Sequence, residues 1–116
     1  MKNARHWLAG SALAFSVVLT TAAVALAEDE TALAISIKDH RFTPAELHAP
    51  AGKPITIVVK NLDSTPEEFE SKALKIEKIV AGNGEITVRL RAQKAGRYRF
   101  FGEYHEDTAK GELVVE

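Results

Sequence analysis

The clearest indication of this chain's architecture is the sequence GRYRFFG at residues 96–102. Tyr98 and Phe100 alternate with Arg97 and Arg99, which is the period of two expected for a strand with one buried face. A turn signal, Lys-Ala-Gly, leads into this alternation. The two aromatic residues are therefore candidates for the core of a β-sheet protein.

Similar alternation continues outward on both sides of this segment. Upstream, the sequence Gly-Asn-Gly at residues 82–84 is a hairpin signal that introduces a strand at 86–90. Further short strands are predicted at 33–37, 45–48, 55–59 and 113–115. About seven short strands separated by turn signals predict an all-β protein, an antiparallel β-sandwich.

Residues 61–80 admit two interpretations. The sequence TPEE at 65–68 resembles a helix start, with a threonine N-cap and a glutamate as its capping-box partner. Apolar residues at helical spacing as far as Val80 would then line one face. In the other interpretation, short strands at 68–70 and 76–80 flank a loop. The sequence leaves both interpretations open.

The first 27 residues have the form of a helical signal peptide. Lys2 and Arg5 precede an uncharged apolar stretch, and Ala25-Leu26-Ala27 has the small-x-small pattern of a cleavage site. We predict a signal peptide over residues 1–27, export to the periplasm by the general secretory route, and one domain over residues 28–116. The alternative is an uncleaved membrane anchor, because the apolar stretch approaches the roughly 20 residues that span a bilayer.

Composition restricts the partners and the stabilising chemistry. The whole chain has a formal charge of −1, and the mature part is more acidic because Lys2 and Arg5 lie in the leader. This charge argues against nucleic acid as a partner. The chain contains no cysteine, so it has no disulfide and no thiolate ligand for a metal.

Several segments of the mature part together resemble the cupredoxin framework. They are FTPAEL at 42–47, PAGK at 50–53, NLD at 61–63, GRYRF at 96–100 and KGELVV at 110–115. Their order and spacing resemble that family over nearly the whole predicted domain. The resemblance implies a cupredoxin-like Greek-key β-sandwich.

The chain departs from the cupredoxins that carry blue copper. Those proteins supply a histidine after the Asn-x-Asp strand, then Cys-x-x-His, and often a methionine. Here the first histidine position holds Glu67 or Glu68, the cysteine position falls at Gly102 and the methionine position falls near Ala109. Only His105 remains in register. Because blue copper requires a thiolate, we do not expect a blue-copper electron-transfer protein.

A closer resemblance is to the cysteine-poor periplasmic cupredoxins of bacterial iron uptake, including the EfeO-type cupredoxin domain and the partners of Ftr-type iron permeases. Glu68-Phe69-Glu70 matches an acidic-aromatic-acidic element of that family. The resemblance implies a metal-binding role for Glu68. It also implies an iron permease, or another membrane transport component, as the partner.

Acidic residues gather around the histidine that stays in register. Glu103 and His105 would share one face if the strand continued past Phe101, and a short loop could return Asp107 toward them. The connection that carries Glu67 and Glu68 is expected at the same end of the sandwich. The predicted metal ligands are Glu67, Glu68, Glu103, His105 and Asp107.

Carboxylate oxygens and one imidazole suit an iron ion, a copper ion or both. Anionic oxygens stabilise Fe(III) more than Fe(II), so this set suggests ferroxidase-like assistance to iron oxidation before delivery to a permease.

Two other functions remain open: a copper-binding carrier without turnover, and a metal-free interaction module. The module would use four arginines between Arg89 and Arg99, which would share a face if the two flanking strands paired as a hairpin. Each acid could also be an ordinary solvated side chain.

Overall fold

The computed structural model describes residues 12–18 and 30–116. Residues 12–18 lie in neither a helix nor a strand, and the rest of the predicted signal peptide lies outside the described residues. No helix in the described ranges is long and apolar enough to cross a membrane.

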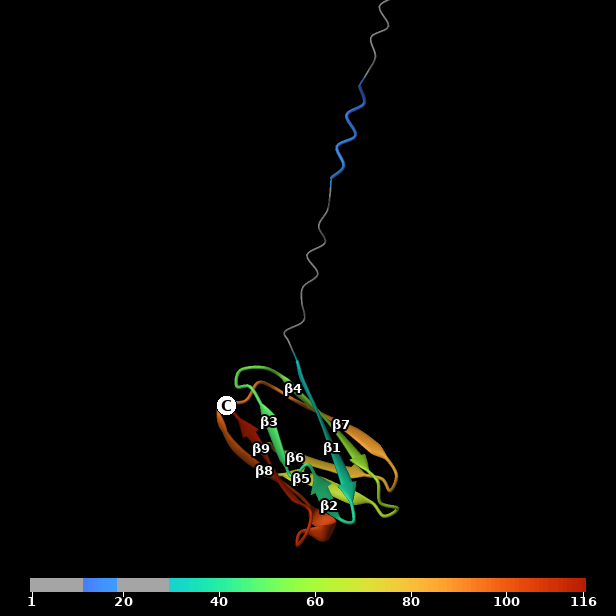
Figure 1. The fold of residues 1–116 in the computed structure, drawn as a ribbon, viewed down its shortest axis with the longest axis vertical. Helices are drawn as coiled ribbons and strands as arrows, with labels where there is room; N and C mark the ends of the chain where they lie inside the picture. The colour runs from blue at the N-terminus through green and yellow to red at the C-terminus, as the bar shows by residue number, and fades with distance from the viewer. Residues whose placement is uncertain (1–11, 19–29) are drawn as a thin grey trace, which may run out of the picture.

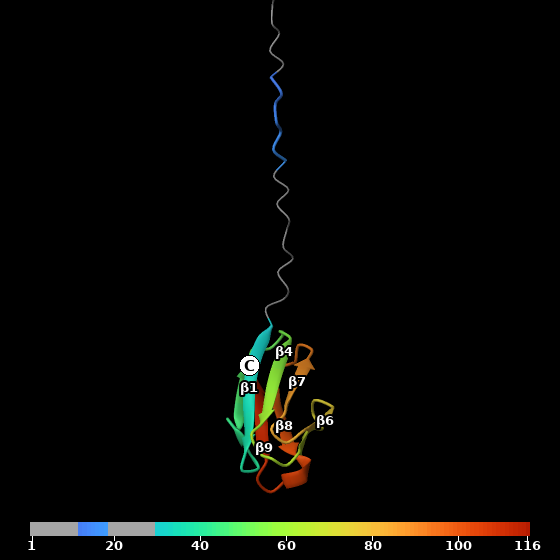
Figure 2. The same cartoon turned by 90° about the vertical axis from the view of Figure 1, so that its right-hand side faces the viewer.

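Residues 30–116 form two β-sheets packed face to face (Figures 1 and 2). The first sheet has the order β2-β1-β4-β7 and the second has the order β3-β9-β8-β5-β6. The strands are β1 (Thr31–Lys38), β2 (Arg41–Thr43), β3 (Glu46–Ala49), β4 (Ile55–Asn61), β5 (Glu67–Ser71), β6 (Ile76–Val80), β7 (Glu85–Leu90), β8 (Gly96–Gly102) and β9 (Lys110–Val115).

The predicted all-β sandwich is confirmed, with nine strands in the described residues where about seven were expected. The prediction that the sandwich is antiparallel is wrong, because β1 pairs with β4 and β3 pairs with β9 in parallel, which makes both sheets mixed. The short strand β2 is not among the strands predicted from the sequence. A single 3₁₀ turn, η1 (Glu103–His105), follows β8 at the end of the sandwich away from the C-terminus (Figure 1).

The ambiguous segment forms two antiparallel strands, β5 and β6, and no helix. Ser71 closes β5, because its hydroxyl donates to the Arg99 carbonyl at 2.6 Å and accepts the Leu74 amide at 3.1 Å. The carbonyl of Thr65, the predicted N-cap, accepts the Asn61 side-chain amide at 2.8 Å. Long-range contacts therefore override the local helix signal.

The turn at 82–84 is present, but it does not join a hairpin as predicted. The Gly84 amide donates to the Ala81 carbonyl at 2.9 Å, and Asn83 has a φ of 58°. The flanking strands β6 and β7 belong to different sheets. A Cβ at Gly82 would lie 2.0 Å from the Ser64 carbonyl oxygen, so this turn packs on the neighbouring loop while the chain crosses between sheets.

The arginine-rich strands are likewise not a hairpin. Arg89 lies in β7 of the first sheet and Arg91 directly follows that strand, whereas β8 carries Arg97 and Arg99 in the second sheet. The two strands do not pair with each other, so the condition under which the four arginines would share one face is not met.

Aromatic rings from β2, β5 and β8 fill part of the core between the two sheets. Phe69 and Phe100 are almost fully buried, and Phe42 packs edge-on against both, with ring centroids 5.8 and 5.1 Å away. The predicted core residue Phe100 is confirmed, while Tyr98 is half-buried and its hydroxyl donates to the Lys94 carbonyl at 2.7 Å. This packing fixes β5 against β8, and these two strands carry the candidate site.

Candidate metal centre

Glu67 lies at the start of β5, on the same face of the strand as the core residue Phe69. Only 1% of this residue is exposed, which is unusual for a carboxylate unless all its oxygens have partners. Oε1 accepts the Tyr104 amide at 2.9 Å and the Glu68 amide at 3.1 Å. Oε2 lies 2.5 Å from Nδ1 of His105. Both oxygens of this buried acid are therefore used.

His105 ends η1 and is partly buried. Because a carboxylate only accepts, Nδ1 of His105 donates to Glu67. The ring stacks on His40, with centroids 3.5 Å apart and planes 10° from parallel. Nε2 of His40 lies 3.5 Å from the Thr65 hydroxyl. Two imidazoles and one buried acid thus occupy the interior side of this end of the sandwich.

Asp63 holds the loop that carries His40. Its two carboxylate oxygens accept the amides of His40 at 3.0 Å and Asp39 at 2.8 Å, where both residues have left-handed backbone. The hydrogen bond from the His40 amide is the main reason that the pKa of Asp63 lies below its ordinary value. An ionised Asp63 stabilises a backbone conformation that is otherwise unfavourable for non-glycine residues.

Gly102 lies against the Glu67 carboxyl group on the interior side of the sheet. A Cβ at this position would lie 2.5 Å from Cδ of Glu67 and 2.7 Å from Cβ of Ala109. Both distances are far below van der Waals contact. The Glu67 carboxyl group therefore occupies the space into which any larger side chain at 102 would extend.

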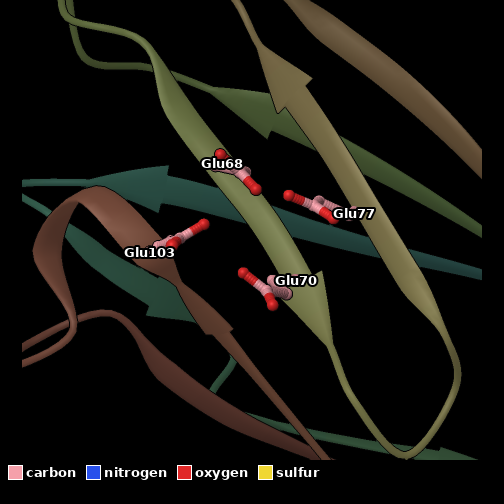
Figure 3. A group of neighbouring side chains, drawn as sticks. All are labelled: Glu68, Glu70, Glu77 and Glu103. Atoms are coloured by element: carbon pink, nitrogen blue, oxygen red, sulfur yellow. The ribbon is translucent and has the colours of Figure 1, made fainter.

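The opposite face of β5 carries a separate group of four carboxylates, which we call the carboxylate cluster (Figure 3). One oxygen from each side chain lies within 4.8 Å of the oxygens of the others. In Figure 3 the four side chains point toward one another from β5, from β6 and from the residue after β8. The members are Glu68, Glu70, Glu77 and Glu103.

Strand register explains this gathering. Glu70 is directly opposite Glu77 in the antiparallel β5–β6 ladder. In the β5–β8 ladder Phe69 pairs with Gly102, so the next position along brings Glu103 beside Glu68. Like charges placed opposite each other destabilise a sheet unless a proton or a cation relieves them.

Glu68 is the most buried member of the carboxylate cluster, with 8% of the residue exposed, and its buried Oε1 has no hydrogen-bond partner in residues 12–18 and 30–116. Hydrogen bonds shared with the carboxyl groups of Glu77 and Glu103 raise the pKa of Glu68 to about 7. Burial, with Glu103 nearby, raises the pKa of Glu70. Burial, followed by the charge of Glu68, raises the pKa of Tyr104, whose phenol contacts the Glu68 carboxyl group.

The predicted ligands fall into two groups and one outlier. Glu68 and Glu103 are in the carboxylate cluster, whereas Glu67 and His105 pair with each other on the interior side. Asp107 is exposed in the turn after η1 and belongs to neither group. Their roles as metal ligands stay predictions.

Two members of the cluster were missed by the sequence analysis. Glu70 had a usable signal, because it is two residues from Glu68 in β5 and therefore shares its face. Glu77 had no signal in the sequence, because its position beside Glu70 depends on the pairing of β5 with β6.

The cluster offers only carboxylate oxygens, which favour hard cations such as Fe(III), Mn(II), Mg(II) or Ca(II). The unpartnered oxygen of Glu68 fits this use, since a buried acceptor needs either a donor or a cation. The interior side offers two imidazoles and one carboxylate, a set typical of copper or zinc sites.

Comparison with known proteins agrees with this architecture. An uncharacterised protein of Rickettsia prowazekii, RP394, is 43% identical over 81 residues, which cover 70% of this chain and 65% of that protein. The chain therefore spans just under two thirds of the length of this relative.

Solved structures with a similar fold include blue copper proteins. Auracyanin A from Chloroflexus aurantiacus matches with a TM-score of 0.65 and 20% identity, over 76% of this chain and 100% of that one. The blue copper oxidase of Nitrosomonas europaea matches with a TM-score of 0.64 and 15% identity, over 76% of this chain and 39% of that one. Amicyanin from Paracoccus versutus matches with a TM-score of 0.58 and 17% identity, over 73% of this chain and 81% of that one.

At these identities the likeness is one of fold. The model of the cupredoxin-like domain family, in contrast, matches residues 11–115, nearly the whole chain. This protein belongs to the cupredoxin-like domain family.

Proposed function

We propose that this protein is a periplasmic metal-binding protein of an iron-uptake system, which binds iron at the carboxylate cluster and passes it to a membrane permease. One observation carries the proposal: the buried Glu68 has an oxygen without a partner among the described residues, and it points toward three other carboxylates. The similarity to cysteine-poor cupredoxins of iron uptake supports the choice of iron. The signal-peptide pattern of residues 1–27 supports the periplasm.

The charge of the cluster supports iron oxidation as part of the role. Four carboxylates interact more strongly with Fe(III) than with Fe(II), because the attraction grows with the charge of the cation. The cluster would therefore lower the reduction potential of bound iron and favour its oxidation by dioxygen. Released iron would reach the permease as Fe(III).

A copper-binding carrier without turnover is the second candidate. The interior side favours it, since imidazole groups from His40 and His105 lie together beside Glu67. Copper(II) also binds most nitrogen and oxygen sites more tightly than the other divalent first-row metals.

The decisive experiment uses purified residues 28–116. Fe(II) and Cu(II) are titrated separately by calorimetry without oxygen, and Fe(II) oxidation in air is then followed with and without stoichiometric copper. We expect one tight iron site, with oxidation faster than in buffer. The variant Glu77→Gln should weaken iron binding at least tenfold, because it removes one anionic oxygen from the cluster.

Glu85→Gln is the matched control, since Glu85 is an exposed glutamate on the other sheet, 3.8 Å from Lys60. It should leave iron binding unchanged. If Glu77→Gln binds iron as tightly as the parent protein, the cluster is not the iron site. If copper binds while iron oxidation stays at the buffer rate, the copper carrier is the better description.

A further inference from the structure

We propose that Glu67 is the positioning residue of the carboxylate cluster: from the interior side of the sheet it holds together the two backbone segments that carry Glu68 and Glu103. This inference rests on the proposed function of the cluster. It assigns Glu67 a role other than metal ligand.

One oxygen of Glu67 joins the two segments. Oε1 accepts the amide of Glu68 in β5 at 3.1 Å and the amide of Tyr104 in η1 at 2.9 Å. Tyr104 is the residue directly after Glu103, so this single atom bridges the backbone beside two members of the cluster. Hydrogen bonds to a charged acceptor are about twice as strong as neutral ones, which makes this bridge stiff.

The second oxygen of Glu67 keeps the carboxyl group in place. Oε2 and Nδ1 of His105 are 2.5 Å apart, which is a direct hydrogen bond. Bonds from a metal to nitrogen or oxygen are about 2.0–2.2 Å long, so two neighbouring ligand atoms on one ion lie about 3 Å apart. In this arrangement Glu67 and His105 are therefore partners of each other, and not joint ligands of an ion between them.

Packing also confines the Glu67 carboxyl group on the side of β8. Gly102 and Ala109 close around it, and a Cβ added to Gly102 would lie 2.7 Å from Oε1 itself. The buried carboxyl group is thus held by three hydrogen bonds and by contact on its remaining side.

The cluster needs such a constraint. Glu103 is exposed on a short 3₁₀ turn and lies among three other carboxyl groups, and those that are ionised repel it when no cation is present. Without the bridge, η1 would be free to move Glu103 away from Glu68. Residues behind metal ligands that fix them in this way typically contribute about 10- to 100-fold in affinity.

The test compares two substitutions at Glu67 with the same two at Glu77. Calorimetry with Tb(III), a hard cation with no redox chemistry, measures affinity at the cluster. Glu67→Ala should weaken binding about 10- to 100-fold, whereas Glu67→Gln should restore most of it. The amide oxygen of glutamine can accept the same two backbone amides, and its NH₂ group can donate to Nδ1 of His105 when the ring proton sits on Nε2, although the side chain carries no charge.

Glu77 provides the contrast expected of a true ligand: Glu77→Gln and Glu77→Ala should be similarly impaired, because both lose the charge. If Glu67→Gln binds as weakly as Glu67→Ala, Glu67 is a ligand and the inference is wrong. If Glu67→Ala does not fold, near-parental affinity in Glu67→Gln still supports positioning and a tenfold loss still contradicts it.

A double-mutant cycle identifies the residue through which Glu67 acts. Adding Glu67→Ala to Glu103→Gln should cost little further affinity, whereas adding it to Glu77→Gln should cost nearly the full amount. Equal costs in both backgrounds would mean general destabilisation and would refute positioning. Gly102→Ala should behave like Glu67→Ala, since its Cβ would displace the carboxyl group.

Amide hydrogen exchange separates this inference from the proposed function. Without any metal, the Tyr104 amide should be protected in the parent protein and in Glu67→Gln, and should exchange freely in Glu67→Ala. If this pattern holds but no cation binds the parent, the bridge exists and the proposed function fails. Free exchange of the Tyr104 amide in the parent would refute the bridge itself.

Discussion

A carboxyl group that holds its proton near neutral pH links the site to the stability of the protein. Glu68 shares hydrogen bonds with Glu77 and Glu103, and its pKa rises from 4.5 to about 7. The folded state therefore binds this proton more tightly than the unfolded chain does. Stability from this source is fully present below pH 4.5 and is lost as the pH rises through about 7.

We therefore expect the melting temperature of the metal-free mature protein to fall as the pH rises from about 5 to about 8. Glu68→Gln should flatten this dependence, because glutamine does not titrate, while Glu85→Gln should keep it. Calorimetric melting at constant ionic strength measures the effect. An equally steep dependence in Glu68→Gln would show that other groups cause it.

At the scale of the strands, Asn61 joins the two sheets where the chain crosses between them. Its side chain, buried at the end of β4, donates to the carbonyls of Thr65 at 2.8 Å and of Val80 and Ala81 at 3.3 Å. Its Oδ1 accepts the Asp63 amide at 3.0 Å. One amide thus connects β4 in the first sheet with β6 in the second.

Asn61→Ala should lower the free energy of unfolding by about 2–3 kcal/mol, because it leaves several buried backbone groups without partners. Gln93→Ala is the control, since that half-buried side chain donates, within the part of the chain that the structure describes, only to the Arg91 carbonyl at 2.8 Å, and its effect should stay within about 0.5 kcal/mol. Urea denaturation of both variants tests this. Equal effects would mean that the Asn61 bonds do not stabilise the crossing.

The strand level also explains which parts of the site were predictable. His105 and Glu67 were found through their positions in the cupredoxin framework that the sequence resembles, and Glu68 was found through its acidic-aromatic-acidic element. Glu77 and the division into two faces depend on the pairing of β5 with β6. Local signals favoured a helix there as much as a strand, and nothing local specifies a partner in space. The hairpin prediction at 82–84 failed for the same reason.

Cation binding should stabilise the whole molecule. At a Tb(III) concentration of about 100 times Kd, binding adds about 2.7 kcal/mol to the free energy of unfolding. For a domain of this size that corresponds to a rise of roughly 10–20 °C in melting temperature. Scanning calorimetry of the parent and of Glu77→Gln measures the shift, which should shrink in the variant. The same rise in both proteins would place the cation elsewhere.

Export is testable on the complete chain. Expressed in a bacterium with a secretory pathway, the protein should be recovered from the periplasm with Glu28 as its first residue, because cleavage is expected after Ala27. Intact-mass spectrometry of the periplasmic fraction measures this. Recovery of the uncut chain in the membrane fraction would favour the anchor.

The contact between Gly102 and Glu67 also determines how this protein could be redesigned. Replacing Gly102 with cysteine would not by itself create a blue-copper protein, since the new Cβ would collide with the Glu67 carboxyl group. Glu67 would have to be replaced together with Gly102, for example as Gly102→Cys with Glu67→His, which would also release Nδ1 of His105 from its hydrogen bond to Glu67. Positions 67 and 102 therefore act as one unit in any redesign of this end of the sandwich.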